Sequence, residues 1–128
     1  MFCRRTFVAL ALALPVAAAL PAIGASKYSP AVLAEAQKSG KPVLVDVTAP
    51  WCPTCKAQKV VLNELNKQAR FKSFVTIEVD FDTQKDALKT LKATSQSTLI
   101  VYKGDKEVGR LAGETKKEAI EALLAKAL

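Results

Sequence analysis

Runs of apolar residues divide the chain beyond its N-terminal segment into strand-like and helix-like stretches. Residues 43–49 form a nearly unbroken, β-branched apolar run, which is typical of a strand covered on both faces. In residues 74–80 alternate positions are apolar, and this alternation predicts a second strand. Residues 97–103 and 106–113 flank a Gly-Asp pair at positions 104–105, which favours an antiparallel hairpin.

Four helices are predicted, and two of them carry clear end signals. Ser29 is a good N-cap, Pro30 suits the first helical turn, and Gly40 ends the helix that follows. The last helix is predicted to open with a capping box made by Thr115 and Glu118. Its expected core positions are Ala119, Ile120, Leu123 and Leu124.

The other two helices are predicted from the spacing of apolar residues. From Cys52 to about Ala69 an apolar residue recurs at every fourth position, which indicates an amphipathic helix. The predicted stripe consists of Ala57, Val61, Leu65 and Ala69, widened by Val60 and Leu62. Residues 83–94 predict a more polar helix with Ala87, Leu88 and Leu91 facing inward.

The order of these elements indicates the fold class. A strand, a helix and a second strand must cross over to a parallel neighbour, while the hairpin adds antiparallel strands. We therefore expect an α/β fold with a central mixed β-sheet flanked by helices on both faces. A chain of 128 residues, half of them apolar, is long enough for one such domain and too short for two.

The first 25 residues differ in composition from the rest. A basic head at residues 4–5 precedes an apolar stretch over residues 7–20 and then small residues, which is the layout of a secretory signal. We therefore expect residues 1–25 to be removed and residues 26–128 to form the domain of an exported, periplasmic protein. The alternative is an uncleaved membrane anchor, because residues 6–26 carry no charge and could span a bilayer of roughly 30 Å.

Charge and composition exclude several classes of function. The net charge is +7, but the lysines are dispersed and interleaved with acidic residues, and aromatic residues make up only 6% of the chain. This pattern indicates solvated faces, so we expect no nucleic-acid partner. The chain has no histidine, which excludes Cys-His and Ser-His catalysis, histidine-bearing metal sites and C-x-x-C-H haem attachment. We expect no cofactor.

Two of the three cysteines, Cys52 and Cys55, lie in the predicted domain, whereas Cys3 lies in the predicted signal. An exported protein enters a compartment in which thiols tend to be oxidised. A disulfide across so short a loop would remove little entropy from the unfolded chain, so stability is a poor reason for the pair. The pair is then a redox centre, half of a metal site, or two inert buried thiols.

The position of Cys52 favours the redox interpretation. It falls where the first strand ends and a helix begins, and a thiolate there is stabilised by the helix dipole and by free backbone N–H groups. Pro53 suits the first turn of that helix, and Cys55 lies about one turn inward, close enough to form a bridge. We therefore predict that Cys52 is an exposed attacking thiolate and that Cys55 is a less exposed resolving thiol.

Asp46 is the one ionisable residue inside the apolar run of residues 43–49. If it is buried, desolvation raises its pKa and makes it a plausible proton acceptor for Cys55. The alternative is that Asp46 lies at an exposed strand edge. Burial is favoured, because no other charged residue interrupts the run.

The segments VLVDVTAPWCPTCK and STLIVYKGDKEVGRLAG together resemble the thioredoxin-like superfamily over nearly the whole domain. The first segment looks closest to periplasmic members, such as the C-terminal domain of Dsb-type membrane disulfide reductases, and its Pro-Thr dipeptide resembles cytochrome c maturation proteins. The resemblance implies that Cys52 is the nucleophile, Cys55 the resolving thiol and Asp46 the buried acid. It also implies a substrate-binding surface made by Trp51, Pro53, Ser97 and Thr98.

Ser97 is a departure from the family, which usually has a cis-proline before this threonine. A cis bond before a residue other than proline costs about 2.5 to 4 kcal/mol. We therefore predict that the bond between Gln96 and Ser97 is trans, and that the loop beside the cysteines differs in shape from the family's. The insert typical of cytochrome c maturation proteins is also missing.

These observations predict an extracytoplasmic thiol-disulfide oxidoreductase that acts as a disulfide reductase through Cys52 and Cys55. Its expected partners are protein thiol and disulfide clients and a membrane-embedded thiol electron donor, and it is expected to be a monomer. The alternative is a soft-metal-binding module in which the same two thiolates supply half of a tetrahedral site in a dimer. A non-catalytic interaction domain is disfavoured by the intact cysteine pair.

Overall fold

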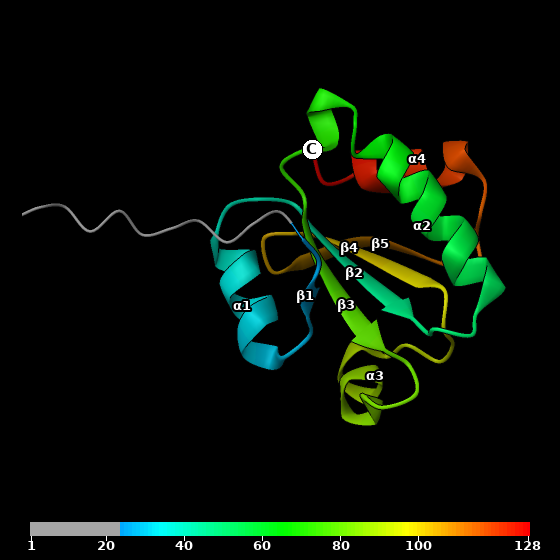
Figure 1. Ribbon diagram of the computed structural model, residues 1–128. Helices are drawn as coiled ribbons and strands as arrows, with labels where there is room; N and C mark the ends of the chain where they lie inside the picture. The colour runs from blue at the N-terminus through cyan, green and yellow to red at the C-terminus, as the bar shows by residue number, and fades with distance from the viewer. Residues whose placement is uncertain (1–23) are drawn as a thin grey trace, which may run out of the picture.

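The computed structural model describes residues 24–128, which form a five-stranded sheet with helices on both faces (Figure 1). The predicted signal falls almost entirely outside the described residues. Within residues 24–128, no helix is both long and apolar enough to cross a membrane. The strands are β1 (Ser26–Lys27), β2 (Val43–Thr48), β3 (Val75–Asp80), β4 (Thr98–Lys103) and β5 (Lys106–Ala112). The helices are α1 (Pro30–Lys38), α2 (Pro53–Leu65), the 3-10 turn η1 (Ala69–Phe71), α3 (Lys85–Leu91) and α4 (Lys117–Ala125).

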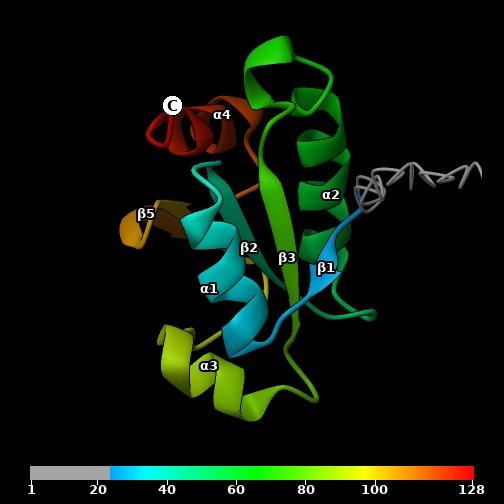
Figure 2. The ribbon, with the colours of Figure 1, turned by 90° about the vertical axis from the view of Figure 1, so that its left-hand side faces the viewer.

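The sheet has the mixed topology that the order of elements predicts. Its strand order is β1-β3-β2-β4-β5, with β2 parallel to β3 and antiparallel to β4. The predicted hairpin is confirmed, because β4 and β5 pair in antiparallel register around the turn. Strand β1 is a difference from prediction: its two residues pair with β3 at the edge of the sheet (Figure 2). A pairing of two residues leaves no periodic signal in the sequence.

The two faces of the sheet carry separate hydrophobic cores. Helices α1 and α3 cover one face, and α2 and α4 cover the other (Figure 1). Because side chains alternate along β2, Val43, Val45 and Val47 point to the α1 and α3 side, whereas Leu44 packs on the α2 and α4 side. Strand β2 is therefore buried on both faces, as its apolar run predicts.

Helix α2 buries only part of the predicted stripe: Leu62 and Leu65 are buried as expected. Val60 is 67% exposed, and Ala57 and Ala69 are also exposed. The buried positions are Cys55, Gln58, Leu62 and Leu65. The every-fourth-residue pattern was misleading because Gln58, a polar residue, occupies a fully buried position. The helix also ends at Leu65, and residues 69–71 form a separate 3-10 turn.

Of the two predicted helix caps, the first is confirmed and the second is wrong. The Ser29 hydroxyl accepts a hydrogen bond of 3.1 Å from the N–H of Val32, and Pro30 is the first residue of α1. Helix α4 begins one residue later than a capping box requires, because the Glu114 carboxylate accepts from the N–H groups of Thr115 and Lys116 at 3.0 and 2.9 Å. Glu114, and not Glu118, thereby pairs with the backbone N–H groups of the two residues that precede α4.

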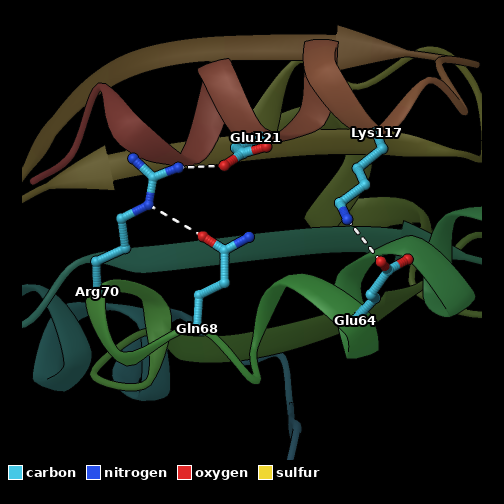
Figure 3. Close-up of polar contacts among 5 residues, drawn as sticks. All are labelled: Glu64, Gln68, Arg70, Lys117 and Glu121. Carbon is cyan, nitrogen blue, oxygen red and sulfur yellow. Dashed lines mark hydrogen bonds and ion pairs between the residues drawn. The ribbon is translucent and has the colours of Figure 1, made fainter.

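Two ion pairs join α4 to α2 and to η1 on the molecular surface (Figure 3). Lys117 of α4 lies 2.5 Å from Glu64 of α2, and Glu121 pairs with Arg70 of η1. All four side chains are substantially solvated, so these pairs contribute little to stability.

Candidate active site at the start of α2

Cys52 occupies the N-cap of α2, directly after the loop that follows β2. Its backbone is extended, and its Sγ accepts a hydrogen bond of 3.1 Å from the N–H of Cys55. Pro53 is the first residue of the helix and has no N–H to leave unpaired. The predicted helix start is therefore confirmed, and the sulfur itself serves as the helix cap. Both cysteines are free thiols in this structure.

The prediction that Cys52 is exposed is wrong. The side chain is only 1% exposed, against 2% for Cys55. Both pack in a small cluster with Ala49 and the partly buried Phe81. Ser97, in the loop that is predicted to lie beside the cysteines, also lies against both sulfurs. A client disulfide therefore reaches the Cys52 sulfur only through a local adjustment of these neighbours.

Two opposing effects act on the Cys52 thiol. Burial raises its pKa, but hydrogen bonds from the side chains of Cys55 and Ser97 and from the backbone of Cys55 and Thr54 outweigh burial. The net effect is a pKa below the ordinary value. A lowered pKa increases the thiolate fraction at neutral pH, and the thiolate is the form that attacks disulfides.

Ser97 touches both sulfurs. Its Oγ lies 3.1 Å from Cys52 Sγ and 3.2 Å from Cys55 Sγ. The predicted trans bond between Gln96 and Ser97 is confirmed, because no peptide bond within residues 24–128 is cis. The backbone of Ser97 nevertheless has a φ of 60°, a left-handed conformation that costs an L-residue roughly 1–2 kcal/mol. The surrounding structure must offset that cost.

Gln58 is a site residue that the sequence pattern missed. Its side chain is fully buried, and Nε2 donates hydrogen bonds of 2.9 Å to the carbonyl oxygens of Ser97 and Glu114. The N–H of Gly113 donates to the same Ser97 carbonyl at 2.9 Å. The one available signal was the position of Gln58, one turn after Cys55 on the same face of α2. These bonds hold the strained Ser97 backbone in place.

Asp46 is buried, as predicted, in the central strand β2. Its side chain is 3% exposed, and its Oδ1 has no hydrogen-bond partner. The pKa of Asp46 is raised from its ordinary value of 3.8 to about 6, chiefly by burial and also by the negative charge of Glu78, while the positive charge of Lys59 acts to lower it. Glu78 lies opposite Asp46 on β3, and its carboxylate is 3.1 Å from Lys59 Nζ. The alternative of an exposed strand edge is wrong.

A hollow of about 550 Å³ connects Cys55 with the charged pair beside Asp46. Its wall includes Cys55, Lys59 and Glu78. Lys59 is one turn after Cys55 on α2, so it lies on the same side of the helix. Water in this hollow would link the resolving thiol to solvent past the Lys59 and Glu78 pair.

The remaining predicted substrate-binding residues differ in exposure. Trp51 is 56% exposed, and its Nε1 donates a 2.8 Å hydrogen bond to Asp82 Oδ2, which fixes the ring beside the cysteines. Pro53 is exposed next to it. Thr98 is buried, and its hydroxyl donates to the Ser95 carbonyl at 2.8 Å, so its side chain anchors the Ser97 loop. Substrate binding by these residues stays a prediction.

For a metal, the site offers few ligands. Among residues 24–128, no group of three or more His, Cys, Asp or Glu side chains gathers in one place. Cys52 and Cys55 are thus two thiolate ligands, whereas a structural zinc site takes four. A metal-binding role would need ligands from a second molecule.

A dithiol at the start of a helix that follows a central strand, with a buried carboxylic acid in that strand, defines a thiol-disulfide oxidoreductase with a thioredoxin-like fold. The Thioredoxin family model matches residues 25–126. The chain belongs to the thioredoxin family.

Named relatives agree with this assignment. The crystal structure of Trxlp from Edwardsiella tarda is 44% identical, with a TM-score of 0.75, and the match covers 79% of this chain and 98% of that one. Thioredoxin from Mycobacterium tuberculosis is 35% identical over 82 residues, which are 64% of this chain and 70% of that protein. A bifunctional thioredoxin reductase/thioredoxin from Mycobacterium leprae is 33% identical over 87 residues, 68% of this chain but only 19% of that protein. These names support the thioredoxin family and not specifically the Dsb-type or cytochrome c maturation proteins.

Proposed function

We propose that this thioredoxin-family protein is an extracytoplasmic disulfide reductase for protein clients. The observation that carries the chemistry is the Cys52 thiolate site at the N-terminus of α2, with Cys55 within hydrogen-bond distance behind it. The signal-like composition of residues 1–25 supports the location. Reduction rather than oxidation is favoured by the resemblance of the active-site segment to periplasmic reductases.

The exchange proceeds in two displacements. The Cys52 thiolate attacks one sulfur of the client disulfide, which forms a mixed disulfide and releases the other client sulfur as a thiolate. Cys55, once deprotonated, then attacks Cys52 Sγ, which closes the Cys52–Cys55 disulfide and releases the second client sulfur. Two electrons pass from the protein dithiol to the client disulfide, and the two client thiolates take up protons.

Asp46 accepts the proton of Cys55 in this scheme. A carboxyl group with a pKa of about 6 is largely ionised at pH 7, yet it holds a proton far more readily than an ordinary aspartate. Its Oδ1 has no competing hydrogen bond, so it is free to take a proton directly or through a water molecule. The hollow lined by Cys55, Lys59 and Glu78 brings solvent beside the resolving thiol and beside Glu78, the neighbour of Asp46 in the sheet.

The oxidised protein must be reduced again before the next turnover. Outside the cytoplasm the electrons must come through the membrane, so we propose a membrane-embedded thiol donor that attacks the Cys52–Cys55 disulfide. The exposed edge of Trp51 beside Cys52 is a suitable contact surface for both donor and client. The protein acts as a monomer in this scheme.

The location and the direction of transfer can be tested together in a Gram-negative host. The full chain is expressed, the periplasmic fraction is isolated, and free thiols are alkylated under acid quench to show the state of Cys52 and Cys55. We expect a periplasmic protein that is mostly reduced and that reduces a periplasmic client disulfide. A matched chain without residues 1–25 should stay in the cytoplasm. Cytoplasmic retention of the full chain, or a mostly oxidised pair that oxidises clients, would contradict the proposal.

A further inference from the structure

The Ser97 hydroxyl is placed to bind the reduced cysteine pair and not the disulfide. It lies at nearly equal distances from Cys52 Sγ and Cys55 Sγ, 3.1 and 3.2 Å. A hydroxyl has one hydrogen to donate and two lone pairs to accept with. With Cys52 as a thiolate and Cys55 as a thiol, the hydroxyl can donate to the Cys52 sulfur. The one S–H of Cys55 donates either to the Ser97 Oγ or to Cys52 Sγ, so each sulfur keeps a hydrogen-bond partner in the reduced pair.

The structure holds this hydroxyl in place from three directions. The Ser97 carbonyl accepts hydrogen bonds of 2.9 Å from Gln58 of α2 and from the N–H of Gly113 at the end of β5. The residue itself is 2% exposed, so water does not compete for its hydroxyl. Thr98, the next residue, is tied to the Ser95 carbonyl. The fold therefore sets the position of the Ser97 hydroxyl. Ser97 does not have to move when the pair is reduced.

We propose that Ser97 is a positioning residue that stabilises the reduced Cys52–Cys55 pair through its hydroxyl and thereby raises the reduction potential of the pair. A hydrogen bond to an ionised sulfur is roughly twice as strong as one between neutral groups. In the disulfide neither sulfur carries charge or a proton, so both bonds are weakened or lost. Stabilising the reduced form makes a pair more oxidising, and the hydroxyl moderates the reducing power of this protein.

The proposal rests on thiol-disulfide exchange by the pair and not on the direction of electron flow or on the location of the protein. It is therefore tested by an equilibrium with glutathione. In that equilibrium the Cys52–Cys55 disulfide takes two electrons and two protons from two glutathione thiols, which join as one glutathione disulfide. A failure of the reductase proposal in cells would leave this measurement unaffected.

The experiment compares the wild type with Ser97→Ala and Ser95→Ala in glutathione buffers of graded ratio. Ser97→Ala keeps the backbone preference of an L-residue and removes the hydroxyl. Ser95→Ala removes another hydroxyl from the same loop. The Ser95 hydroxyl contacts Thr98 and not the sulfurs. We expect the Ser97→Ala equilibrium to move about tenfold towards the disulfide, equivalent to a potential about 30 mV more negative. Ser95→Ala should match the wild type.

A second readout and a second variant separate the hydroxyl from the backbone. The ultraviolet absorbance of the thiolate should titrate at higher pH in Ser97→Ala than in the wild type, which a purely structural role would not cause. Ser97→Gly removes the hydroxyl and also relaxes the left-handed backbone. It should show the same change in potential as Ser97→Ala. An unchanged potential in both variants, or an equal change in Ser95→Ala, would overturn the proposal.

Discussion

The side-chain amide of Gln58 donates a 2.9 Å hydrogen bond to the carbonyl of Ser97, 39 residues further along the chain. Gln58 lies one turn after Cys55 on α2, so the helix that carries the cysteines also holds the loop that covers them. The same amide reaches the Glu114 carbonyl between β5 and α4. One buried side chain therefore joins three segments around the sulfurs. Its removal leaves the Ser97 carbonyl with the Gly113 N–H alone and takes the amide donor from the partly buried Glu114 carbonyl.

The first prediction concerns this amide. Gln58→Leu should lower the free energy of unfolding by about 1–3 kcal/mol, because carbonyl groups of Ser97 and Glu114 lose a buried donor. Asn63→Ala, at an exposed position of the same helix, is the control and should change stability by less than about 0.5 kcal/mol. Urea unfolding of the two variants and the wild type measures the difference. Equal stability of all three would show that these hydrogen bonds are not maintained in solution.

The second prediction separates the roles of the two cysteines. Cys55→Ser should accumulate mixed disulfides with clients through Cys52, because attack survives and resolution does not. Cys52→Ser should accumulate almost none. Non-reducing gel electrophoresis after acid quench gives the yield of each. Equal yields from the two variants, or none from either, would rule out the assigned order of attack.

The third prediction follows from the raised pKa of Asp46, about 6 against an ordinary 3.8. The folded state holds this proton more tightly than the unfolded state, so the contribution of Asp46 to stability is most favourable below about pH 4 and is lost as the pH rises through 6. A pKa difference of this size corresponds to about 3 kcal/mol. Asp46→Asn, which cannot ionise, should therefore be more stable than the wild type at pH 7 by up to about that amount.

The control for the Asp46→Asn variant is a second measurement of its stability, and that of the wild type, at low pH. The stability advantage of Asp46→Asn should shrink towards zero below about pH 4, where the wild-type carboxyl is protonated in both states. The same variant should reduce client disulfides more slowly near neutral pH, since an amide cannot accept the Cys55 proton. If Asp46→Asn is no more stable than the wild type at pH 7, the stability claim is wrong. If it reduces clients as fast as the wild type from about pH 6 to 9, Asp46 is not the proton acceptor.

The fourth prediction concerns the charged pair beside Asp46. Glu78→Gln removes a negative charge that raises the pKa of Asp46, so that pKa should fall. Lys59→Met removes the positive charge that lowers it, so the pKa should rise. Carbon-13 NMR of the Asp46 carboxyl during a pH titration measures both shifts. Lys67→Met, an exposed lysine after α2, is the control. Shifts in the same direction for both variants would mean that the pair acts through packing and not through charge.

The fifth prediction distinguishes an oxidoreductase from a soft-metal module. Cys52 and Cys55 supply two thiolates, half of a tetrahedral zinc site. The reduced protein should therefore remain a monomer when zinc is added in slight excess and should retain little zinc after gel filtration. Light scattering and zinc analysis of the eluted peak measure both. A dimer that carries one zinc per two chains, and that disappears in Cys52→Ser, would instead support the metal module.

Much of the fold and the centre of the site could be read from local patterns. The apolar run of β2, the hairpin of β4 and β5 and the cap at Ser29 are short-range features, and short-range preferences decide them. Asp46 was recognisable because a carboxylic acid within an apolar run stands out from its neighbours. The helix start at Cys52 followed from the change of pattern beside Pro53. In each case the signal and the structure lie within the same few residues.

Only the tertiary structure decided how the sulfurs are covered and tuned. The sequence did not indicate the burial of Gln58, because a buried glutamine is recognisable only once the carbonyls that pair with it are known. The left-handed backbone of Ser97 and its contact with both sulfurs depend on a loop held by α2 and by the end of β5. The burial of Cys52 has the same origin. Several of these contacts join distant residues, 39 positions apart for Gln58 and Ser97 and 45 for Cys52 and Ser97, and no local preference encodes which distant group will supply the partner.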